Sequence, residues 1–201
     1  LTYYGHTKNP THVTGAQANL NTGEHLVTGG VQYMHDYLND QTTADSKYYI
    51  DETYSNAAVF LQDNVHFFDE EQLEIVFGGR VDKHSHVADP IFSPRINVKG
   101  QFGDGFTARV SYSTGFKAPQ TFDEDLHIDV LAGDQRIVRN SENLQEEKSR
   151  SFNLGLEFQG NVNDIPVLFA LTGFHTRLYD AFAQVPKEID EDGIIVYERI
   201  N

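Results

Sequence analysis

The stretch Phe106-Thr-Ala-Arg-Val-Ser-Tyr-Ser113 alternates strictly between two kinds of side chain. In an extended chain its even-numbered residues would form one apolar face, and its odd-numbered residues would form one polar face. Residues 151–158 repeat the pattern with Phe and Leu at the even positions, and residues 73–82 follow it around two glycines. Such alternation is typical of antiparallel strands that have one face in apolar surroundings.

Working outward from this stretch, the sequence predicts an all-β protein with hardly any helix. Several of the expected strands run to ten residues or more, which is longer than the usual strand of soluble sheets. We expect about nine strands, at residues 11–20, 25–38, 54–68, 73–82, 91–102, 106–116, 147–159, 165–180 and 194–201.

The connections between these strands alternate between short and long. Tight turns rich in Gly, Asn and Asp are expected at 21–24, 69–72, 103–105 and 160–164. Longer connections are expected at 39–53, 83–90, 117–146 and 181–193. In an antiparallel up-and-down meander this order places all tight turns at one end of the sheet. Short turns at one end, long loops at the other and strands of about ten residues are typical of a transmembrane β-barrel.

Composition excludes several other classes of protein. The 201 residues carry 15 Lys and Arg against 30 Asp and Glu, and a net charge of −15 argues against binding to nucleic acid. The chain has no Cys, so disulfides, Cys-ligated metals and thiol catalysis are excluded. No run approaches the roughly eighteen consecutive apolar residues of a membrane-spanning helix.

Six short motifs follow one another in a characteristic order. The motifs are Phe-Leu-Gln-Asp-Asn at 60–64, Gly-Gly-Arg-Val-Asp at 78–82, Ser-Pro-Arg-Ile-Asn-Val at 93–98, Arg-Val-Ser-Tyr-Ser-Thr-Gly-Phe-Lys-Ala-Pro at 109–119, Leu-Gln-Glu-Glu-Lys-Ser at 144–149 and Asn-Leu-Gly-Leu-Glu-Phe at 153–158. This succession resembles the β-barrel part of TonB-dependent outer-membrane receptors, and the match covers about residues 54–180. Lys117 stands where that family usually has Arg.

The resemblance implies a barrel of 22 strands whose lumen is closed by a plug. It implies an outer-membrane receptor of a Gram-negative bacterium, which takes up a scarce ligand such as a ferric siderophore, haem or cobalamin with energy from TonB. TonB would act through the plug, the barrel would contact outer-membrane lipid, and a surface lipoprotein is a further partner. We expect residues 1–201 to be one partial barrel domain, with the plug, the TonB box and the C-terminal strands outside it.

Seven residues are candidates for a functional role. Arg80 and Arg109 are expected to face the lumen. Tyr48 and Tyr49 in one long loop, and His127, Arg136 and Arg139 in another, are expected to contact ligand. Cationic and aromatic groups at the mouth of a receptor suit anionic, ring-bearing chelates.

No catalytic residue, metal ligand or cofactor is predicted. The pair His84 and His86 is expected to be solvated on a polar connection, and the acidic residues of 117–146 do not have the EF-hand spacing. The sequence has no nucleophile elbow, zinc-protease motif or phosphate-binding glycine loop, so an enzyme is not expected. Two alternatives from other classes stay open, namely a passive porin-like channel and a soluble all-β binding domain.

Overall fold

The computed structural model describes residues 6–41, 49–67, 72–121, 136–191 and 193–201. Nine strands form one large sheet and three form a small one. The strands are β1 (His6–Lys8), β2 (Thr11–Thr22), β3 (His25–Gln41), β4 (Ile50–Phe67), β5 (Leu73–His84), β6 (Ile91–Phe102), β7 (Phe106–Lys117), β8 (Arg136–Asn140), β9 (Glu147–Val162), β10 (Ile165–Tyr179), β11 (Ala183–Ile189) and β12 (Ile195–Ile200).

The large sheet is the antiparallel meander that the sequence predicts. From β3 to β7 each strand pairs with the next along the chain, β2 pairs with β3, and β9 lies between β7 and β10. Every pairing in this sheet is antiparallel, and its register extends over up to 16 residue pairs. The all-β meander is therefore confirmed, with eight long strands in place of nine.

The prediction for residues 194–201 was wrong about their place in the fold. They do form a strand, β12, but it pairs with β11 and β8 in the small sheet and not with β10. The reason is that the expected long loop 181–193 contains β11, which uses β12 as its hairpin partner. The ninth strand of the large sheet is instead the short β1, which pairs with β3.

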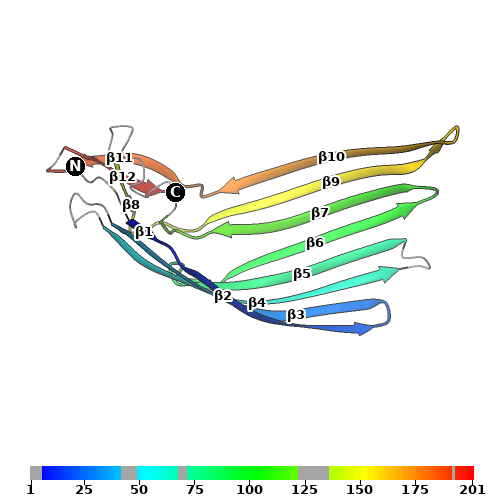
Figure 1. Ribbon diagram of the computed structural model, residues 1–201, viewed down its shortest axis with the longest axis horizontal. Coiled ribbons are helices and arrows are strands. Elements are labelled where there is room, and N and C mark those ends of the chain that lie inside the picture. The colour runs from blue at the N-terminus through cyan, green and yellow to red at the C-terminus, as the bar shows by residue number, and fades with distance from the viewer. Residues whose placement is uncertain (1–5, 42–48, 68–71, 122–135, 192) are drawn as a thin grey trace.

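The described tight turns lie together at one end of the large sheet, and the small sheet lies at the other end (Figure 1). In the turn between β9 and β10, Asn163 and Asp164 both have positive φ, 49° and 60°. This is the backbone of a type I′ hairpin, which Asn and Asp tolerate. The expected turn at 69–72 lies outside the described residues except for Gln72. The alternation of short and long connections is thus confirmed where the structure describes it.

The turn between β6 and β7 requires glycine at residue 105. Gly105 has φ 95°, and a Cβ atom there would lie 1.9 Å from the carbonyl oxygen of Gln159 on β9. The close approach is held by a hydrogen bond of 2.9 Å from the Gln159 N–H to the Gly105 carbonyl. Glycine at this position therefore lets β7 and β9 pair up to the turn.

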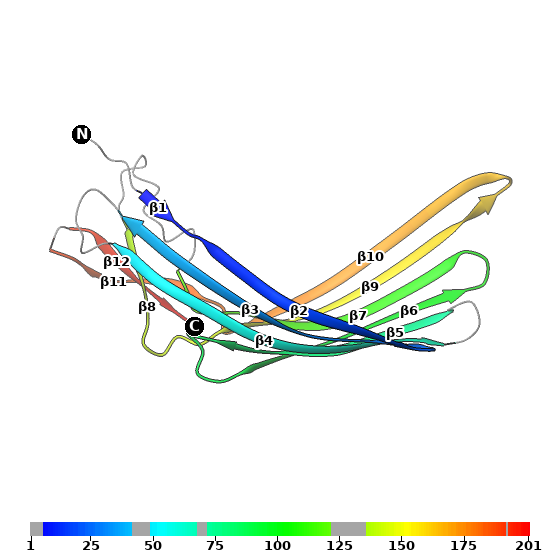
Figure 2. The ribbon, with the colours of Figure 1, turned by 60° about the horizontal axis from the view of Figure 1, so that its bottom comes forward.

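The large sheet is a single curved layer that forms an open trough (Figure 2). Few hydrophobic side chains are buried, and the small cluster of Val87, Ile91 and Ala118 packs at the loop end. One face is apolar and exposed; Val110 is 37% and Leu154 is 42% accessible. The other face is mostly polar. Among the described residues no helix is long and apolar enough to cross a membrane.

Candidate functional site

The small sheet joins described segments of two long connections at one end of the trough (Figure 1). β8 pairs with β12 in parallel, although 54 residues separate Asn140 from Ile195 along the chain, and β12 pairs with β11 in a hairpin. Val196 in the central strand β12 is only 2% accessible. The guanidinium of Arg199, also buried, donates to the Gln120 carbonyl at 3.1 Å and to Asn140 Oδ1 at 3.3 Å. Three loop segments are therefore joined through β12.

Asn201 ties this small sheet to the large one. Its Nδ2 donates to the Asp180 carbonyl at 2.6 Å and to the Gln145 carbonyl at 3.2 Å, and its Oδ1 accepts from the Gln145 N–H at 2.7 Å. Gln145 precedes β9 and Asp180 follows β10. The side-chain amide thus links the loop ends of β9 and β10, two neighbouring strands of the large sheet.

One ion pair joins two neighbouring strands of the small sheet. Lys187 Nζ on β11 donates to Glu198 Oε1 on β12 at 2.6 Å. This hydrogen bond raises the pKa of Lys187 above its ordinary value. Glu198 is also the register partner of Arg139 on β8, so cationic residues lie on both sides of its strand.

A polar cluster of three buried residues and one exposed residue lies on the polar face at the loop end. We call Tyr54, Asp82, His84 and His86 the loop-end cluster. The Tyr54 ring lies 4.8 Å from the His86 ring and 6.4 Å from the His84 ring, centroid to centroid. Its hydroxyl accepts a hydrogen bond of 2.9 Å from the Thr121 N–H, which holds the start of the loop after β7.

Asp82 supplies the charge of the loop-end cluster. Both of its oxygens lie 2.9 Å from Arg80 Nε and share the single hydrogen of that nitrogen, and Oδ1 also accepts a hydrogen bond of 2.7 Å from Asn56 Nδ2. Asp82 is almost completely buried, whereas a third of the Arg80 side chain is accessible. Burial of a carboxylate is costly unless it is paired and hydrogen-bonded, and both conditions are met here.

The expectation that His84 is solvated was wrong. His84 is the last residue of β5 and is 3% accessible, because the Tyr54 ring stacks over it, whereas His86 is exposed. Its Nδ1 accepts a hydrogen bond of 3.1 Å from the His86 N–H, which assigns the proton of the neutral ring to Nε2. Within the described part of the chain, no three His, Cys, Asp or Glu side chains are arranged to hold a metal ion.

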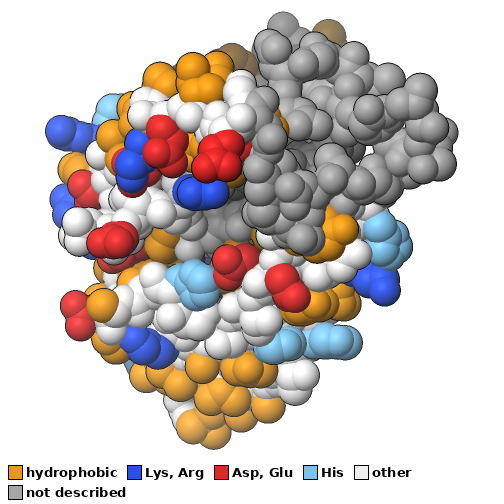
Figure 3. All heavy atoms as spheres, turned by 90° about the vertical axis from the view of Figure 1, so that its left-hand side faces the viewer, with side chains coloured by type: hydrophobic (Ala, Val, Ile, Leu, Met, Phe, Trp, Pro, Cys, Tyr) orange, Lys and Arg blue, Asp and Glu red, His pale blue; other side chains and the backbone are white. Residues whose placement is uncertain are grey.

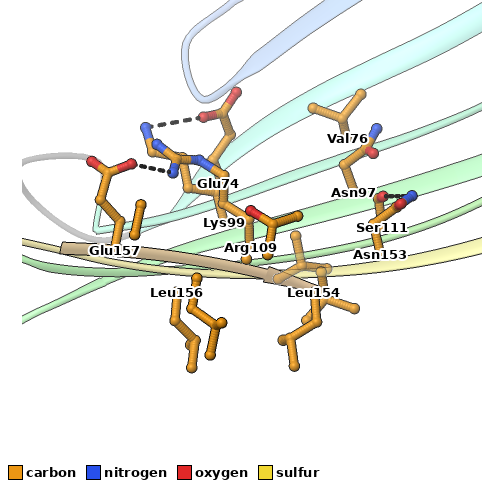
Figure 4. Close-up of a pocket in the computed structure, with 16 residues that line it drawn as sticks. Glu74, Val76, Asn97, Lys99, Arg109, Ser111, Asn153, Leu154, Leu156 and Glu157 are labelled. Carbon is orange, nitrogen blue, oxygen red and sulfur yellow. Dashed lines mark hydrogen bonds and ion pairs between the residues drawn. The ribbon is translucent and has the colours of Figure 1, made fainter. Parts of the chain in front are cut away.

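A second polar group crosses the middle strands towards the tight turns. Glu74, Lys99, Arg109 and Glu157 form what we call the charge ladder, because they lie on four different strands of one face. Lys99 Nζ lies 3.6 Å from Glu74 Oε2, and Arg109 Nη1 lies 3.2 Å from Glu157 Oε2. Figure 4 shows these side chains on one side of the sheet and Leu154 on the other.

The charge ladder borders a groove of about 380 Å³ on the polar face. Ser111 and Asn153 continue the same face, joined by a hydrogen bond of 3.0 Å from Asn153 Nδ2 to Ser111 Oγ (Figure 4). The groove carries two positive and two negative groups in pairs. Its charged groups therefore nearly balance one another.

The structure distributes the described sequence-predicted residues over four places. Arg80 belongs to the environment of the loop-end cluster and Arg109 to the charge ladder, both on the polar face. Arg136 and Arg139 lie on β8 of the small sheet, and Arg139 is exposed. Tyr49 immediately precedes β4 and is 42% accessible. The predicted contacts Tyr48 and His127 lie outside the described residues. The loop end in Figure 3 shows acidic, basic and histidine side chains interspersed, with hydrophobic side chains at its lower margin.

Sequence reasoning missed the roles of Tyr54 and Arg199. Tyr54 is predicted near a strand end, but nothing in the sequence indicates that it packs against His84 and reaches Thr121. Arg199 lies in a predicted strand, and its buried contacts with Gln120 and Asn140 come from distant parts of the chain. Periodicity within one strand carries no signal for such contacts.

Comparison with known proteins identifies the family. The family model described as TonB dependent receptor-like, beta-barrel matches residues 1–200. The chain belongs to this family. The "Iron-regulated outer membrane virulence protein" of Vibrio cholerae serotype O1 is 30% identical over 165 residues, which cover 81% of this chain and 24% of that protein. The chain thus spans about a quarter of the length of this relative.

Solved structures of TonB-dependent receptors share the fold. The siderophore receptor PirA from Pseudomonas aeruginosa superposes with a TM-score of 0.78 at 21% identity, over 97% of this chain and 37% of that one. The copper transporter OprC gives a TM-score of 0.68 at 14% identity, over 98% and 33%. The homologues are outer-membrane receptors of Gram-negative bacteria, which confirms the expected localisation. The family is a class of transport receptors and not a class of enzymes.

Proposed function

We propose that this chain forms part of the wall of an outer-membrane receptor that imports an iron chelate with energy from TonB. The observation that carries the proposal is the single-layered sheet with one polar face, one apolar face and ordered loops at one end, in a chain of this family. The similarity to the iron-regulated outer membrane protein of Vibrio cholerae favours an iron-bearing ligand. A ferric siderophore is the first candidate and haem the second, whereas cobalamin lacks this support.

The polar face would line the lumen and the apolar face would contact outer-membrane lipid. Arg80 and Arg109 would then face the lumen, each already paired with a carboxylate of the wall. A surface whose cationic and acidic side chains are already paired with one another is hydrated and does not bind a charged ligand tightly. TonB would act through a plug outside residues 1–201. A surface lipoprotein would be a further partner at the loop end.

The ligand would be captured by the loop end. We assign its contacts to Tyr48, Tyr49, His127, Arg136 and Arg139. The parallel pairing of β8 with β12 supports the two arginines, because it gives them fixed backbone positions on an ordered strand. A guanidinium held in place loses less conformational freedom on binding an anionic chelate than one on a free loop.

Uptake by cells tests the proposal. The full-length receptor is expressed in cells that have or lack a working TonB. Accumulation of radiolabel is measured with iron-labelled ferric siderophore, iron-labelled haem or cobalt-labelled cobalamin. We expect TonB-dependent accumulation of iron from one of the two iron ligands. Flux that persists without TonB would instead indicate a passive channel and would overturn the proposal.

The assigned arginines are tested in the same cells. The variant Arg136→Ala/Arg139→Ala should weaken ligand binding about a hundredfold or more, because charge-assisted hydrogen bonds contribute about 1.5–3 kcal/mol each and the variant removes two arginines. Lys8→Ala, an exposed cation on β1, serves as the control. Equal binding by the double variant and the control would remove both arginines from the site.

A further inference from the structure

The apolar face of β9 and β10 changes character at its loop end. On β9 this face begins with a valine at the tight turn. From there up to Phe152, every residue of the face is Gly, Phe or Leu. Above Phe152 the face becomes cationic and aromatic, and neither strand has an acidic residue on it. The residues above this boundary are Lys148 and Arg150 on β9, and His175, Arg177 and Tyr179 on β10.

Two of these cations face each other directly. Arg150 and Arg177 are cross-strand partners in the register of β9 and β10. Directly opposed residues of an antiparallel pair have Cβ atoms about 4.5–5.5 Å apart, and like charges at that position are destabilising. The repulsion would be strongest beside hydrocarbon, where the surroundings screen charge poorly.

The partners that the structure gives these groups leave positive charge uncompensated. Lys148 Nζ lies 2.9 Å from Glu146 Oε1. The guanidinium carbons of Arg150 and Arg177 lie 4.9 Å and 5.0 Å from the centroid of the Tyr179 ring, an aromatic contact that positions both without neutralising either. In the described segments neither of these arginines forms an ion pair with a carboxylate. Both are exposed.

We propose that Arg150 and Arg177, steadied by Tyr179, bind the phosphate of an outer-leaflet lipid whose acyl chains lie on the apolar face below. The proposal rests on the membrane placement given under Proposed function. A guanidinium fork matches the oxygens of a phosphate, and one phosphate between the two arginines would turn their repulsion into attraction. Phe152 and Leu154 on β9 and Leu171 on β10, all exposed, supply the surface for the chains.

The charge balance of the molecule favours this occupant. The chain as a whole carries −15, so an anionic partner is repelled by most of its surface. The arginine pair lies next to an apolar surface and is free of acidic neighbours on its own face. An anion that also carries hydrocarbon fits both features, whereas free phosphate uses only one.

Lipid binding to the purified full-length receptor tests this site. Native mass spectrometry measures the binding of lipid A with both phosphates, of the same lipid A after dephosphorylation, and of inorganic phosphate. Arg150→Glu and the reciprocal Arg177→Glu reverse one charge each, and Lys8→Glu is the charge-matched control at the opposite edge of the sheet. Either reversal places opposite charges across from each other, so circular dichroism should show a folded barrel.

We expect the two reversals to weaken binding of phosphorylated lipid A about tenfold or more, and Lys8→Glu to leave it unchanged. Dephosphorylated lipid A should bind the unaltered receptor correspondingly less. Unchanged lipid binding in folded Arg150→Glu and Arg177→Glu would overturn the site. So would inorganic phosphate that binds as tightly as the lipid, because this indicates an adventitious ion only.

The uptake assay separates this proposal from the proposed function. If the receptor imports iron with TonB but binds both forms of lipid A equally, the lipid site fails alone. If it prefers the phosphorylated lipid and shows no TonB-dependent uptake, the lipid site stands and the transport proposal fails.

Discussion

At the scale of single residues, Asp82 organises the loop end of the polar face. Its carboxylate satisfies Arg80 and Asn56 at once, and it lies within the layer that holds Tyr54 and His84. Arg80 keeps a third of its side chain accessible, so water relieves part of the cost if its partner is lost. The pair is therefore a structural element of the wall whose removal has a moderate cost.

Replacing Asp82 by Ala in the full-length receptor should lower the free energy of unfolding by about 1–3 kcal/mol, because buried donors lose their acceptor. Denaturant unfolding in detergent measures this. Asp89→Ala, which removes an exposed carboxylate in the connection after β5, should stay within about 0.5 kcal/mol of the unaltered protein. The double variant Arg80→Ala/Asp82→Ala should cost less than the sum of its single changes. Equal effects of Asp82→Ala and Asp89→Ala would contradict this role.

At the scale of elements, the eight long strands of the meander could be predicted and the small sheet could not. Alternation over ten or more residues, bounded by turns such as Asn163-Asp164, is a local signal and fixes both faces. β8 has five residues, and β11 contains Pro186 at an irregularity in its pairing. The pairing of β8 with β12 joins residues far apart in the sequence, and no local pattern indicates it.

The small sheet should depend on the buried side chain of Val196. We expect Val196→Ala to lower the local stability of β8, β11 and β12 by about 1–2 kcal/mol, since roughly two methyl groups leave a packed site. Hydrogen exchange should then show faster exchange in these strands and unchanged exchange in β5 to β7. Ile189→Ala, at a position 70% accessible, is the control. Slower or equal exchange in β12 of the Val196 variant would show that this side chain does not hold the sheet.

At the scale of the whole molecule, the large sheet is a single curved layer and not part of a compact globule (Figure 2). A period of two assigns Arg80 and Arg109 to the polar face from sequence alone. Their partners depend on which residues the register brings close; Glu157 reaches Arg109 across a diagonal, since Gly155 is the direct partner of Arg109. The ligand contacts depend on loops, for which sequence periodicity gives no prediction. The region of the candidate site could therefore be predicted, but only some of its residues could.

The most direct test of this account compares two neighbouring residues of β7. Val110 is exposed on the apolar face, and Ser111 lies on the polar face, where its hydroxyl accepts a hydrogen bond from Asn153. In a full-length receptor without other cysteines, a fluorophore is attached to Val110→Cys or to Ser111→Cys in reconstituted membranes, and quenching by a nitroxide-labelled lipid is measured. If β7 is part of a membrane wall, the label at 110 is strongly quenched and the label at 111 is not. Equal quenching at both positions, or quenching at 111 alone, would contradict the account.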